Sequence, residues 1–545
     1  MAAEARKTMG LTRVIAASSA GTAFEWYDFF IFGSLIQIIS KTFFSALPPT
    51  ASLIAALGLF AAGFAFRPLG AILFGSLGDR MGRKGAFLIT ISLMGGATFL
   101  IGCLPTYAQA GWLAPALLIL LRICQGTALG GEYGGAAIYV AEHAPDHGRG
   151  YATGWIQSSA AFGLLAALAV ILVTRTLIGE DAFSAWGWRV PFLLSAILLG
   201  VSLWLRTTLG ESPAFIALEE EGNVTKTPLR EAFADPASLR QVSIAFFALM
   251  CAQGAVWYST FFYMQVFLEK MVGLPGKTVN ELVMVMTIVS APLYVLFGWL
   301  SDKWGRKPVM LAGMIVALVA YFPGYHAIAR AANPALIAAQ AATPVTVVTD
   351  PETCSVQFDP AGTRHFATAC DIAKSLLAGS GISTREARSS DGTTAIAVGR
   401  TLLPVPDGSH LDAKGLKALK AATGDRLKAA LTAAGYPAKA DLAAVDWFTL
   451  MAWLLLFTTA ACALYGPMAA ALVEMFPTRV RYTAMSLPYH IGTGWVGGFL
   501  PVTSFAIVAI TGNLYAGLWY AVAFTAVSVV TSLLFFKETS GQPLT

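Results

Sequence analysis

Long apolar runs separated by short polar breaks dominate the sequence. Most of these runs are about 20 residues or longer, which is the length that an α-helix needs to cross the hydrocarbon core of a bilayer. The pattern therefore predicts an all-α membrane protein with twelve transmembrane helices. The predicted spans are 15–43, 52–78, 86–104, 113–140, 153–176, 188–206, 241–268, 279–300, 308–329, 445–472, 483–510 and 515–536.

Composition supports a lipid environment. Hydrophobic residues make up 56% of the 545 residues and charged residues only 12%. A soluble protein of this size could not cover so much apolar surface, so the bilayer is the expected partner. The net charge of +5 is too small to indicate nucleic acid, and we predict no such partner. The first apolar run is too long for a signal peptide, which predicts a retained first helix.

Basic residues in the short loops predict the orientation. They follow the second, eighth and tenth spans, whereas the short loops 105–112 and 511–514 contain no Lys or Arg. By the positive-inside rule both termini lie in the cytoplasm. We therefore expect a multi-pass protein of the bacterial inner (plasma) membrane. The basic residues are Arg80, Arg83, Lys84, Lys303, Arg306, Lys307, Arg479 and Arg481.

Two loop motifs are repeated. GSLGDRMGRK (75–84) matches GWLSDKWGRK (298–307), and AEHAPDHGR (141–149) matches VEMFPTRVR (473–481) more weakly. The second pair is separated by about 110 residues more than the first, which predicts an insertion of that length in the second half. The predicted domains are an N-terminal six-helix half (1–206), a cytoplasmic linker (207–240), a C-terminal six-helix half (241–330 and 444–545) and a periplasmic insertion (331–443) between helices 9 and 10.

The insertion is predicted to be a small α/β module. Segments 344–350 and 394–405 resemble strands, and 365–379 and 425–437 resemble helices, the second with Asp425 as its N-cap. Cys354 and Cys370 both fall in this module on the oxidising side of the membrane, so we hypothesise a disulfide; two unpaired thiols are the alternative.

The doubled loop motif predicts a gate. Its aspartates, Asp79 and Asp302, could meet the dipole of a neighbouring helix N-terminus or a basic partner. Contacts of this kind, made in one conformation and broken in another, bias a two-state equilibrium. Glu142 and Arg149 are expected to brace the same cytoplasmic gate, as Glu474 and Arg481 would in the matching loop. Alternatively, the basic residues of this motif serve only to orient the chain in the membrane. The predicted gating residues are Asp79, Arg83, Asp302, Arg306, Glu142 and Arg149.

At this point the chain resembles the major facilitator superfamily. EWYDFFIFG in the first span, FRPLGAILFGSLGDRMGRK through the second, RICQGTALGGEYGGA in the fourth and WGWRVPFLLS in the sixth are similar to its metabolite:proton symporter branch. That branch includes permeases for shikimate, α-ketoglutarate, citrate, dicarboxylates and proline or betaine. The resemblance covers roughly 12–330 and 445–540. It implies two six-helix halves of the major facilitator fold and a monomeric transporter of a small molecule and protons.

Four charged residues are expected near the middle of the membrane. Glu25 and Asp28 share one face of the first span, while Arg67 and Arg122 come to overlapping depths from the second and fourth spans. Charges within a membrane normally face the bundle interior and pair. We therefore predict that Asp28, Glu25 and Arg122 couple transport to protons, with Asp28 as the favoured carrier. In the superfamily the pattern R-x-x-Q-G, here Arg122 to Gly126, is linked to this role.

The guanidinium of an arginine matches a substrate carboxylate. Span 7 offers hydrogen-bonding groups to the second half of a central cavity, although each of them could instead join helices. Tyr27 could line the cavity or pack between helices, and Glu132 and His490 are weaker titratable candidates. The predicted substrate-binding residues are Arg67, Arg122, Tyr27, Gln125, Gln253 and Tyr258.

The expected function is secondary-active, proton-coupled import of a small organic acid or zwitterionic metabolite by alternating access. A proton-driven exporter of the same fold and a membrane sensor that uses the periplasmic module are the alternatives. An enzyme is not expected, because the sequence has neither a Ser/His/Asp pattern nor metal-ligand spacing, and GTALGG (126–131) lies inside a span. No cofactor or metal is predicted.

Overall fold

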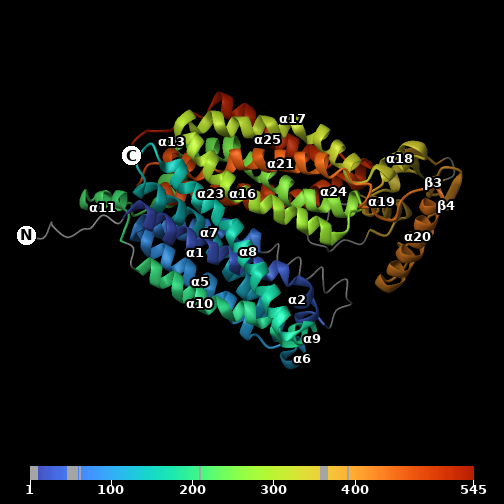
Figure 1. Ribbon diagram of the computed structural model, residues 1–545, viewed down its shortest axis with the longest axis horizontal. Coiled ribbons are helices and arrows are strands. Elements are labelled where there is room, and N and C mark those ends of the chain that lie inside the picture. The colour runs from blue at the N-terminus through green and yellow to red at the C-terminus, as the bar shows by residue number, and fades with distance from the viewer. Residues whose placement is uncertain are drawn as a thin grey trace, which may run out of the picture.

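The computed structural model describes residues 10–45, 59, 63–207, 210–355, 366–389 and 392–544. Most of them are helical, and Figure 1 shows two bundles of long helices. The first bundle comprises α1 (Leu11–Ser34), α2 (Ile36–Phe43), α4 (Arg67–Met81), α5 (Arg83–Cys103), α6 (Tyr107–Ala110), α7 (Leu113–His143), α8 (Arg149–Ile178), α9 (Glu180–Ala182), η1 (Phe183–Gly187) and α10 (Arg189–Thr207). Two short helices, α11 (Pro213–Glu220) and α12 (Pro228–Phe233), lie in the predicted linker.

The second bundle starts with a helix of 36 residues, Pro236–Met271, in which α- and π-helical turns alternate. π-helical turns are rare and often occur at functional sites. This helix comprises α13 (Pro236–Ile244), η2 (Ala245–Met250), α14 (Cys251–Tyr258), η3 (Ser259–Tyr263), α15 (Met264–Val266) and η4 (Phe267–Met271). The bundle continues with α16 (Gly276–Trp304), α17 (Arg306–Ala332), α21 (Trp447–Tyr465), α22 (Met468–Met475), α23 (Arg481–Ile491), η6 (Gly492–Gly497), α24 (Leu500–Thr511) and α25 (Leu518–Leu534).

Nine helices within the described ranges are long and apolar enough to cross a membrane. They correspond to the third to eleventh predicted spans and extend a few residues beyond most of them, because polar residues at the span ends remain helical. The first span, α1, contains Glu25 and Asp28, which lower its mean hydropathy. Part of 52–78 lies outside the described residues, and α25 is shorter than the others. The count of twelve spans stays a prediction.

Polarity is distributed as lipid requires. Large apolar side chains face outward: Leu172, Val319 and Leu534 are 65%, 70% and 68% exposed. Polar side chains such as Arg122 and Gln125 are buried inside the bundle. The outward apolar surface can be solvated by hydrocarbon, while buried polar groups find partners on other helices.

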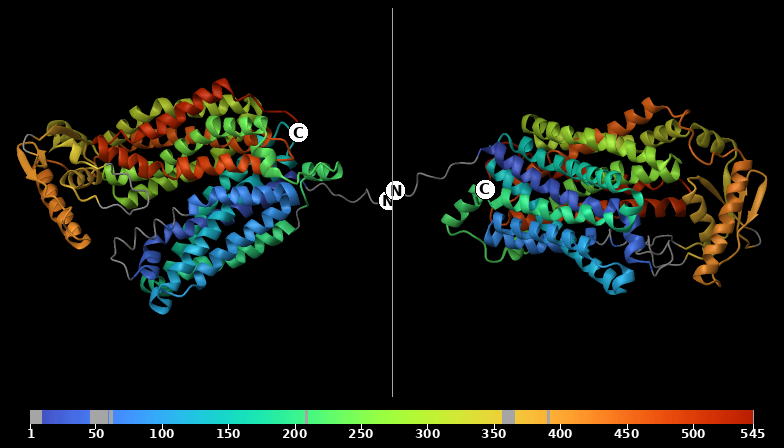
Figure 2. Two further views of the ribbon diagram at one scale, coloured as in Figure 1. Left: turned by 180° about the vertical axis from the view of Figure 1, so that it is seen from behind. Right: turned by 60° about the horizontal axis from the view of Figure 1, so that its bottom comes forward.

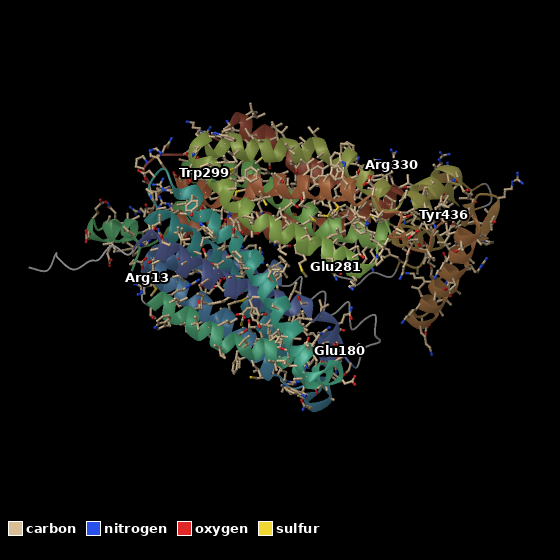
Figure 3. All side chains as sticks on the ribbon, viewed as in Figure 1. Arg13, Glu180, Glu281, Trp299, Arg330 and Tyr436 are labelled. Carbon is tan, nitrogen blue, oxygen red and sulfur yellow. A yellow bond between two sulfur atoms is a disulfide. The ribbon has the colours of Figure 1, made fainter. Side chains whose placement is uncertain are left out.

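The two bundles contact each other mainly along two helix pairs, α8 with α16 and α4 with α23. Figures 1 and 2 show that the bundles meet at the end where α1 begins and where the chain leaves α25, and diverge toward the other end. We call these the terminal end and the insertion end. In Figure 3 Arg13 marks the terminal end, whereas Glu180 and Tyr436 mark the insertion end.

The insertion forms a four-stranded sheet with helices packed on it. Strand order is β2-β1-β3-β4, with β1 parallel to β2 and the other pairs antiparallel. Val345, Ile372, Ile396 and Leu427 are buried in its core. Its elements are α18 (Pro334–Ala342), β1 (Val345–Thr349), η5 (Pro351–Thr353), α19 (Ala369–Gly379), β2 (Thr384–Arg388), β3 (Ala395–Val398), β4 (Thr401–Pro404) and α20 (Ala413–Ala433).

Three details of the insertion differ from the sequence analysis. Segment 394–405 is a hairpin of β3 and β4 rather than one strand, and Gly399 in its turn has φ +58°. Asp425 is not an N-cap, because α20 begins twelve residues earlier and its N-cap is Asp412, which accepts the Gly415 amide at 2.7 Å. Strand β2 was missed because its sequence TREAR is charged and largely exposed at the sheet edge.

The insertion is docked on the second bundle. The amide of Thr384 donates to the carbonyl of Gly512 at 2.7 Å, and the amide of Ala440 donates to the carbonyl of Gly273 at 3.0 Å. Lys374 Nζ donates to the Ile510 carbonyl at 3.1 Å. These contacts join the module to the turn between η4 and α16 and to the α24–α25 turn, so it is expected to move with the second bundle.

Cys354 and Cys370, which the sequence analysis paired, are joined by a disulfide, and their Cα atoms are 5.2 Å apart. The thiols of Cys103, Cys124, Cys251 and Cys462 are free. The bond ties the end of η5 to the first turn of α19.

The disulfide predicts a definite alkylation pattern. Iodoacetamide applied to the denatured, unreduced protein should modify four of the six cysteines, and all six after reduction; intact mass measures both. In the matched variant Cys354→Ser the released Cys370 should bring the unreduced number to five. Six modified cysteines in the unreduced wild-type protein would show that the bond does not form.

Candidate functional site

Two aspartates of the repeated motif cap helices of the opposite bundle at the terminal end. Asp79, near the end of α4, accepts the amides of Tyr482 at 3.2 Å and Thr483 at 2.8 Å, the second and third residues of α23. Asp302, near the end of α16, accepts the amides of the second and third residues of α8 at 2.8 and 2.7 Å. The first amides of a helix have no partner within the helix and carry partial positive charge, so a carboxylate there is stabilising.

An arginine four residues later holds each aspartate. Arg83 donates to Asp79 at 2.8 Å, and Arg306 donates to Asp302 at 2.6 Å. Each arginine also approaches a glutamate at the end of another helix. Arg306 is 3.0 Å from Glu474, and Arg83 is 3.9 Å from Glu142. All of these side chains are almost fully buried, so each charge depends on its partner.

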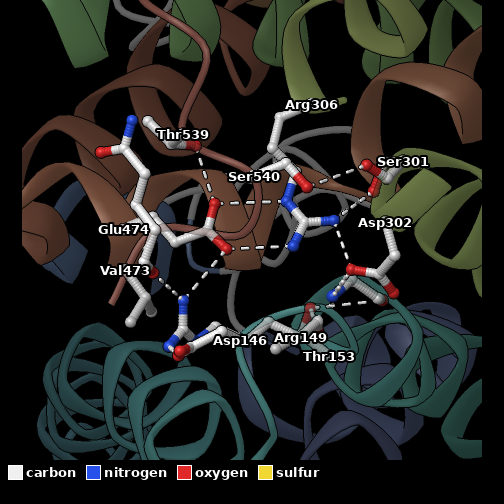
Figure 4. Close-up of polar contacts among 12 residues, drawn as sticks. Asp146, Arg149, Thr153, Ser301, Asp302, Arg306, Val473, Glu474, Thr539 and Ser540 are labelled. Atoms are coloured by element: carbon white, nitrogen blue, oxygen red, sulfur yellow. Dashed lines mark hydrogen bonds and ion pairs between the residues drawn. The ribbon is translucent and has the colours of Figure 1, made fainter. Parts of the chain in front are cut away.

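Two further ion pairs each join an acid of one bundle to an arginine of the other. Glu142 of the first bundle pairs with Arg481 of the second at 2.6 Å, and Arg149 of the first bundle lies 3.6 Å from Glu474 of the second. The sequence analysis grouped Glu142 with Arg149 and Glu474 with Arg481 according to their loops, whereas the structure pairs each acid with the arginine of the other loop. Figure 4 shows Arg149, Glu474, Arg306 and Asp302 in one continuous set of contacts. We call the following eight side chains the terminal-end network: Asp79, Arg83, Glu142, Arg149, Asp302, Arg306, Glu474 and Arg481.

Sequence reasoning missed two glutamates that extend this network. Glu211 accepts the amides of Arg83 and Lys84 at 3.1 Å, and Glu538 accepts the amides of Arg306 and Lys307 at 2.8 and 3.0 Å. Each glutamate therefore caps the helix that follows the repeated motif. The sequence did contain a signal for these two caps, because Glu-Ser at 211–212 and Glu-Thr at 538–539 stand at the same place, just after the last helix of each half.

In the first bundle, a chain of polar contacts links Asp28 to Arg122. Arg122 donates to Gln125 Oε1 at 2.7 Å, and Gln125 Nε2 donates to Thr98 Oγ1 at 2.7 Å. The Thr98 hydroxyl donates to the Met94 carbonyl at 2.9 Å and lies next to Asp28, which accepts from Ser195 at 2.5 Å. Asp28, Arg122 and Gln125 are no more than 4% exposed. The predicted acid and arginine therefore communicate through two neutral side chains rather than by direct contact.

The partner of Glu25 differs from the expectation. Its carboxylate lies 3.5 Å from Arg206 NH2, not beside Arg67 or Arg122. Arg206 sits in the last turn of α10, where a basic residue at a span end resembles an ordinary topogenic charge. The two acids of α1 therefore have different surroundings, Asp28 among neutral hydrogen-bond donors and Glu25 beside a cation.

Both predicted arginines lie beside one aromatic ring. The guanidinium carbon of Arg67 is 5.2 Å from the centre of the Phe29 ring, and that of Arg122 is 5.5 Å from it. Arg67 also lies 4.4 Å from the Phe64 ring, which in turn packs against the ring of Tyr258 in the second bundle. Its Nε and NH2 atoms have no hydrogen-bond partner among the described residues. Two cations in one buried region can attract an anion.

The other predicted binding residues lie in different settings. The Tyr27 hydroxyl donates to the Pro191 carbonyl at 2.8 Å, so it joins α1 to α10. Gln253 is 2% exposed, and its Oε1 lacks a hydrogen-bond partner among the described residues; both ring nitrogens of His490 lack one as well. Gln253 and His490 thus offer polar atoms from the second bundle that the described protein does not satisfy.

The comparison with protein families decides the identity. The profile of the Major Facilitator Superfamily matches residues 19–347. The chain belongs to the major facilitator superfamily. The matched stretch ends at β1, near the start of the insertion.

Individual relatives narrow the resemblance within the superfamily. The chain is 34% identical over 329 residues to the proline/betaine transporter of Salmonella typhimurium, covering 58% of this chain and 64% of that protein, which is less than two thirds of its length. It is 33% identical over 329 residues to the shikimate transporter of Escherichia coli, covering 59% of this chain and 74% of that protein. These relatives confirm the predicted branch of metabolite permeases and the prediction that the protein is not an enzyme.

A solved structure confirms the major facilitator fold. The proton:xylose symporter XylE bound to 6-bromo-6-deoxy-D-glucose superimposes with a TM-score of 0.63 at 14% sequence identity, covering 98% of this chain and 97% of that one. At this identity the likeness concerns the fold alone. Within this superfamily fold, the terminal-end network lies where the two bundles meet.

The network predicts that removing one charge opens the terminal end. In Glu142→Gln, Arg481 loses its partner at 2.6 Å, and such a loss typically costs about 3–5 kcal/mol. The population open at this end should rise by about 100-fold or more. The rate at which a maleimide labels Ser486→Cys, a buried position on α23, measures this population after the free cysteines have been replaced.

Two variants control this measurement. The double variant Glu142→Gln/Arg481→Gln leaves no unpaired arginine and should label more slowly than Glu142→Gln alone. The exposed acid Glu180 lies at the insertion end, so Glu180→Gln should label at the wild-type rate. Equal labelling of wild type and Glu142→Gln would show that the pair does not hold this end closed.

Proposed function

We propose that the protein is a proton-coupled symporter that imports a small organic acid or zwitterionic metabolite by alternating access. The path of polar contacts from Asp28 to Arg122 carries this proposal, because it connects a titratable acid with a cation that can bind a carboxylate. Superfamily membership and relatives named for proline/betaine and shikimate support the substrate class.

In the proposed orientation the terminal end faces the cytoplasm and the insertion end faces the periplasm. The positive-inside pattern of the short loops supports it. With the terminal-end network formed and the bundles diverging toward the insertion end, the conformation corresponds to closure on the cytoplasmic side. The proposed substrate enters between the bundles from the periplasm.

The proposed binding step uses the two arginines. Arg67 Nε and NH2 have no hydrogen-bond partner among the described residues, and Arg122 lies beside the same Phe29 ring, so a substrate carboxylate that reaches both arginines would gain charge-assisted hydrogen bonds. Gln253 and His490 can accept or donate further hydrogen bonds from the second bundle. A ligand that touches both bundles can draw them together at the periplasmic end, which is the closing movement that alternating access needs.

The proposed coupling step changes the charge of Asp28. When Asp28 is ionised, it accepts a hydrogen bond from Ser195 and its charge acts on the neighbouring Thr98, which orders the path to Gln125 and Arg122. A proton on Asp28 turns one carboxylate oxygen into a donor and weakens that order. Arg122 is then less engaged with its own bundle and more available to an anion, so proton and substrate favour each other's binding.

Uptake into proteoliposomes tests the function. Labelled proline, glycine betaine, shikimate, citrate, α-ketoglutarate and simple dicarboxylates would be offered with and without an inward proton gradient. At least one should accumulate only with the gradient. If none of them accumulates, the proposed function is wrong; accumulation driven by an outward gradient alone would favour export.

Two substitutions test the residues. Asp28→Asn should abolish the dependence on the gradient, and Arg122→Lys should lower uptake by about 10-fold or more, since it loses the planar fork that holds Gln125 and receives a carboxylate. Glu180→Gln and Arg175→Lys are matched controls in a partly exposed pair at the insertion end and should transport normally. Normal, gradient-dependent uptake by both Asp28→Asn and Arg122→Lys would place the coupling site elsewhere.

A further inference from the structure

The ion pair between Glu25 and Arg206 is buried and poorly satisfied. The side chains are 5% and 2% exposed, and their closest atoms are 3.5 Å apart. Neither carboxylate oxygen of Glu25 and none of the three guanidinium nitrogens of Arg206 has a hydrogen-bond partner among the described residues. A buried ion pair offsets its desolvation only when hydrogen bonds satisfy both groups, so this pair is held by charge alone.

The surroundings are nevertheless shaped for Arg206. A Cβ at Gly21 would lie 2.3 Å from Arg206 NH2, so only glycine leaves room for the guanidinium beside α1. On its other side the guanidinium carbon lies 3.3 Å from the centre of the Phe87 ring of α5. The Arg206 guanidinium therefore lies between α1 and α5.

Tyr482 connects this pair to the other bundle. It is fully buried at the start of α23, its amide donates to Asp79, and its hydroxyl donates to the Gly131 carbonyl. Its ring occupies the space that side chains at Gly78 and Gly134 would need: a Cβ added at these positions would lie 2.1 and 2.9 Å from ring atoms of Tyr482. The ring of a residue in the second bundle is thus inserted into a glycine-lined slot of the first.

Tyr482 also approaches the pair by way of Phe87: a Cβ at Gly135 would lie 2.6 Å from the Tyr482 hydroxyl and 3.2 Å from the ring of Phe87, on which the Arg206 guanidinium rests. The elements packed against α1 and α10 bring other titratable or charged side chains. Among the described residues these are Lys41 on α2, Arg83, Lys84 and Cys103 on α5, Arg122, Cys124, Glu132, Tyr133, Tyr139, Glu142 and His143 on α7, and Arg149, Tyr151 and Arg175 on α8, together with Arg13, Tyr27 and Asp28 on α1 itself and Arg189 on α10. Arg206 is the cation that forms an ion pair with Glu25, at 3.5 Å.

We infer that the Glu25–Arg206 pair is a second proton-responsive element, distinct from Asp28, and that Arg206 is a positioning residue that acts on the terminal end through Tyr482. This inference rests on the proposed function. A proton that leaves Asp28 moves about one helical turn toward the terminal end to reach a Glu25 oxygen. Neutral Glu25 leaves Arg206 as a buried cation without its partner, so Arg206 is displaced. The Tyr482 slot then loosens and the bundles separate at that end, where Glu25 releases the proton.

The experiment measures opening of the terminal end without any substrate. The full chain, with its free cysteines replaced and the disulfide kept, carries spin labels at Arg80→Cys on α4 and Lys303→Cys on α16, two exposed positions at that end. Electron–electron distance measurements in phosphatidylcholine nanodiscs compare about pH 8 with about pH 5. We expect the wild-type distances to shift toward longer values at the lower pH.

Variants assign the shift to the pair. Glu25→Gln, an isosteric mimic of the protonated acid, should show the long distances at both pH values. Glu25→Gln/Arg206→Gln contains no unpaired buried charge and should be insensitive to pH, which keeps the test valid if the single variant folds poorly. Asp28→Asn should retain a pH-dependent shift, since Glu25 remains.

Two results would overturn the inference: wild-type distances that do not change with pH, or a wild-type shift that persists in Glu25→Gln. The same labelled protein separates this inference from the proposed function. If no offered substrate is taken up but the pH-dependent shift is present and lost in Glu25→Gln, the substrate proposal fails and the pair retains its role. If uptake is gradient-dependent while the shift is absent, the reverse holds.

Discussion

Two reciprocal helix caps determine how the halves of this protein meet. Asp79 of the first bundle accepts the opening amides of α23, and Asp302 of the second bundle accepts those of α8. Each cap satisfies backbone donors that would otherwise be buried without partners. Because the acid and the helix that it caps belong to different bundles, the bundles cannot separate at this end without exposing both. The arginines and glutamates of the terminal-end network surround these two helix caps.

The insertion adds asymmetry to an otherwise repeated architecture. Its hydrogen bonds from Thr384, Ala440 and Lys374 go to the second bundle, so any rocking of the bundles carries the module with only one of them. A module fixed in this way changes its distance to the first bundle as the insertion end opens and closes. Its compact core and disulfide make it a rigid body for that movement.

Much of this arrangement was readable from the sequence, and the failures have physical causes. Hydropathy located the long helices because lipid requires continuous apolar runs, and the repeated motif pointed to a helix N-terminus as the partner of its aspartates. The exchange between Glu142 and Arg481 was missed because a repeat permits pairing within a loop or between loops. Arg206 was missed because a basic residue at a span end serves topology equally well. Thr98 and Ser195 are neutral and have no pattern that marks them as partners of an acid.

The different surroundings of Glu25 and Asp28 explain why one helix carries two acids. Asp28 accepts a hydrogen bond from Ser195 and lies next to Thr98, which is linked through Gln125 to Arg122, so the charge of Asp28 can act at the place where a substrate would bind. Glu25 has no hydrogen bond from the described residues and faces a cation that is confined beside the closed end. A single acid could not act on both the region near Arg122 and the terminal end near Arg206, because a path of polar contacts and an ion pair both act only over a short range. Two acids about one turn apart allow binding and opening to be separate steps driven by one proton.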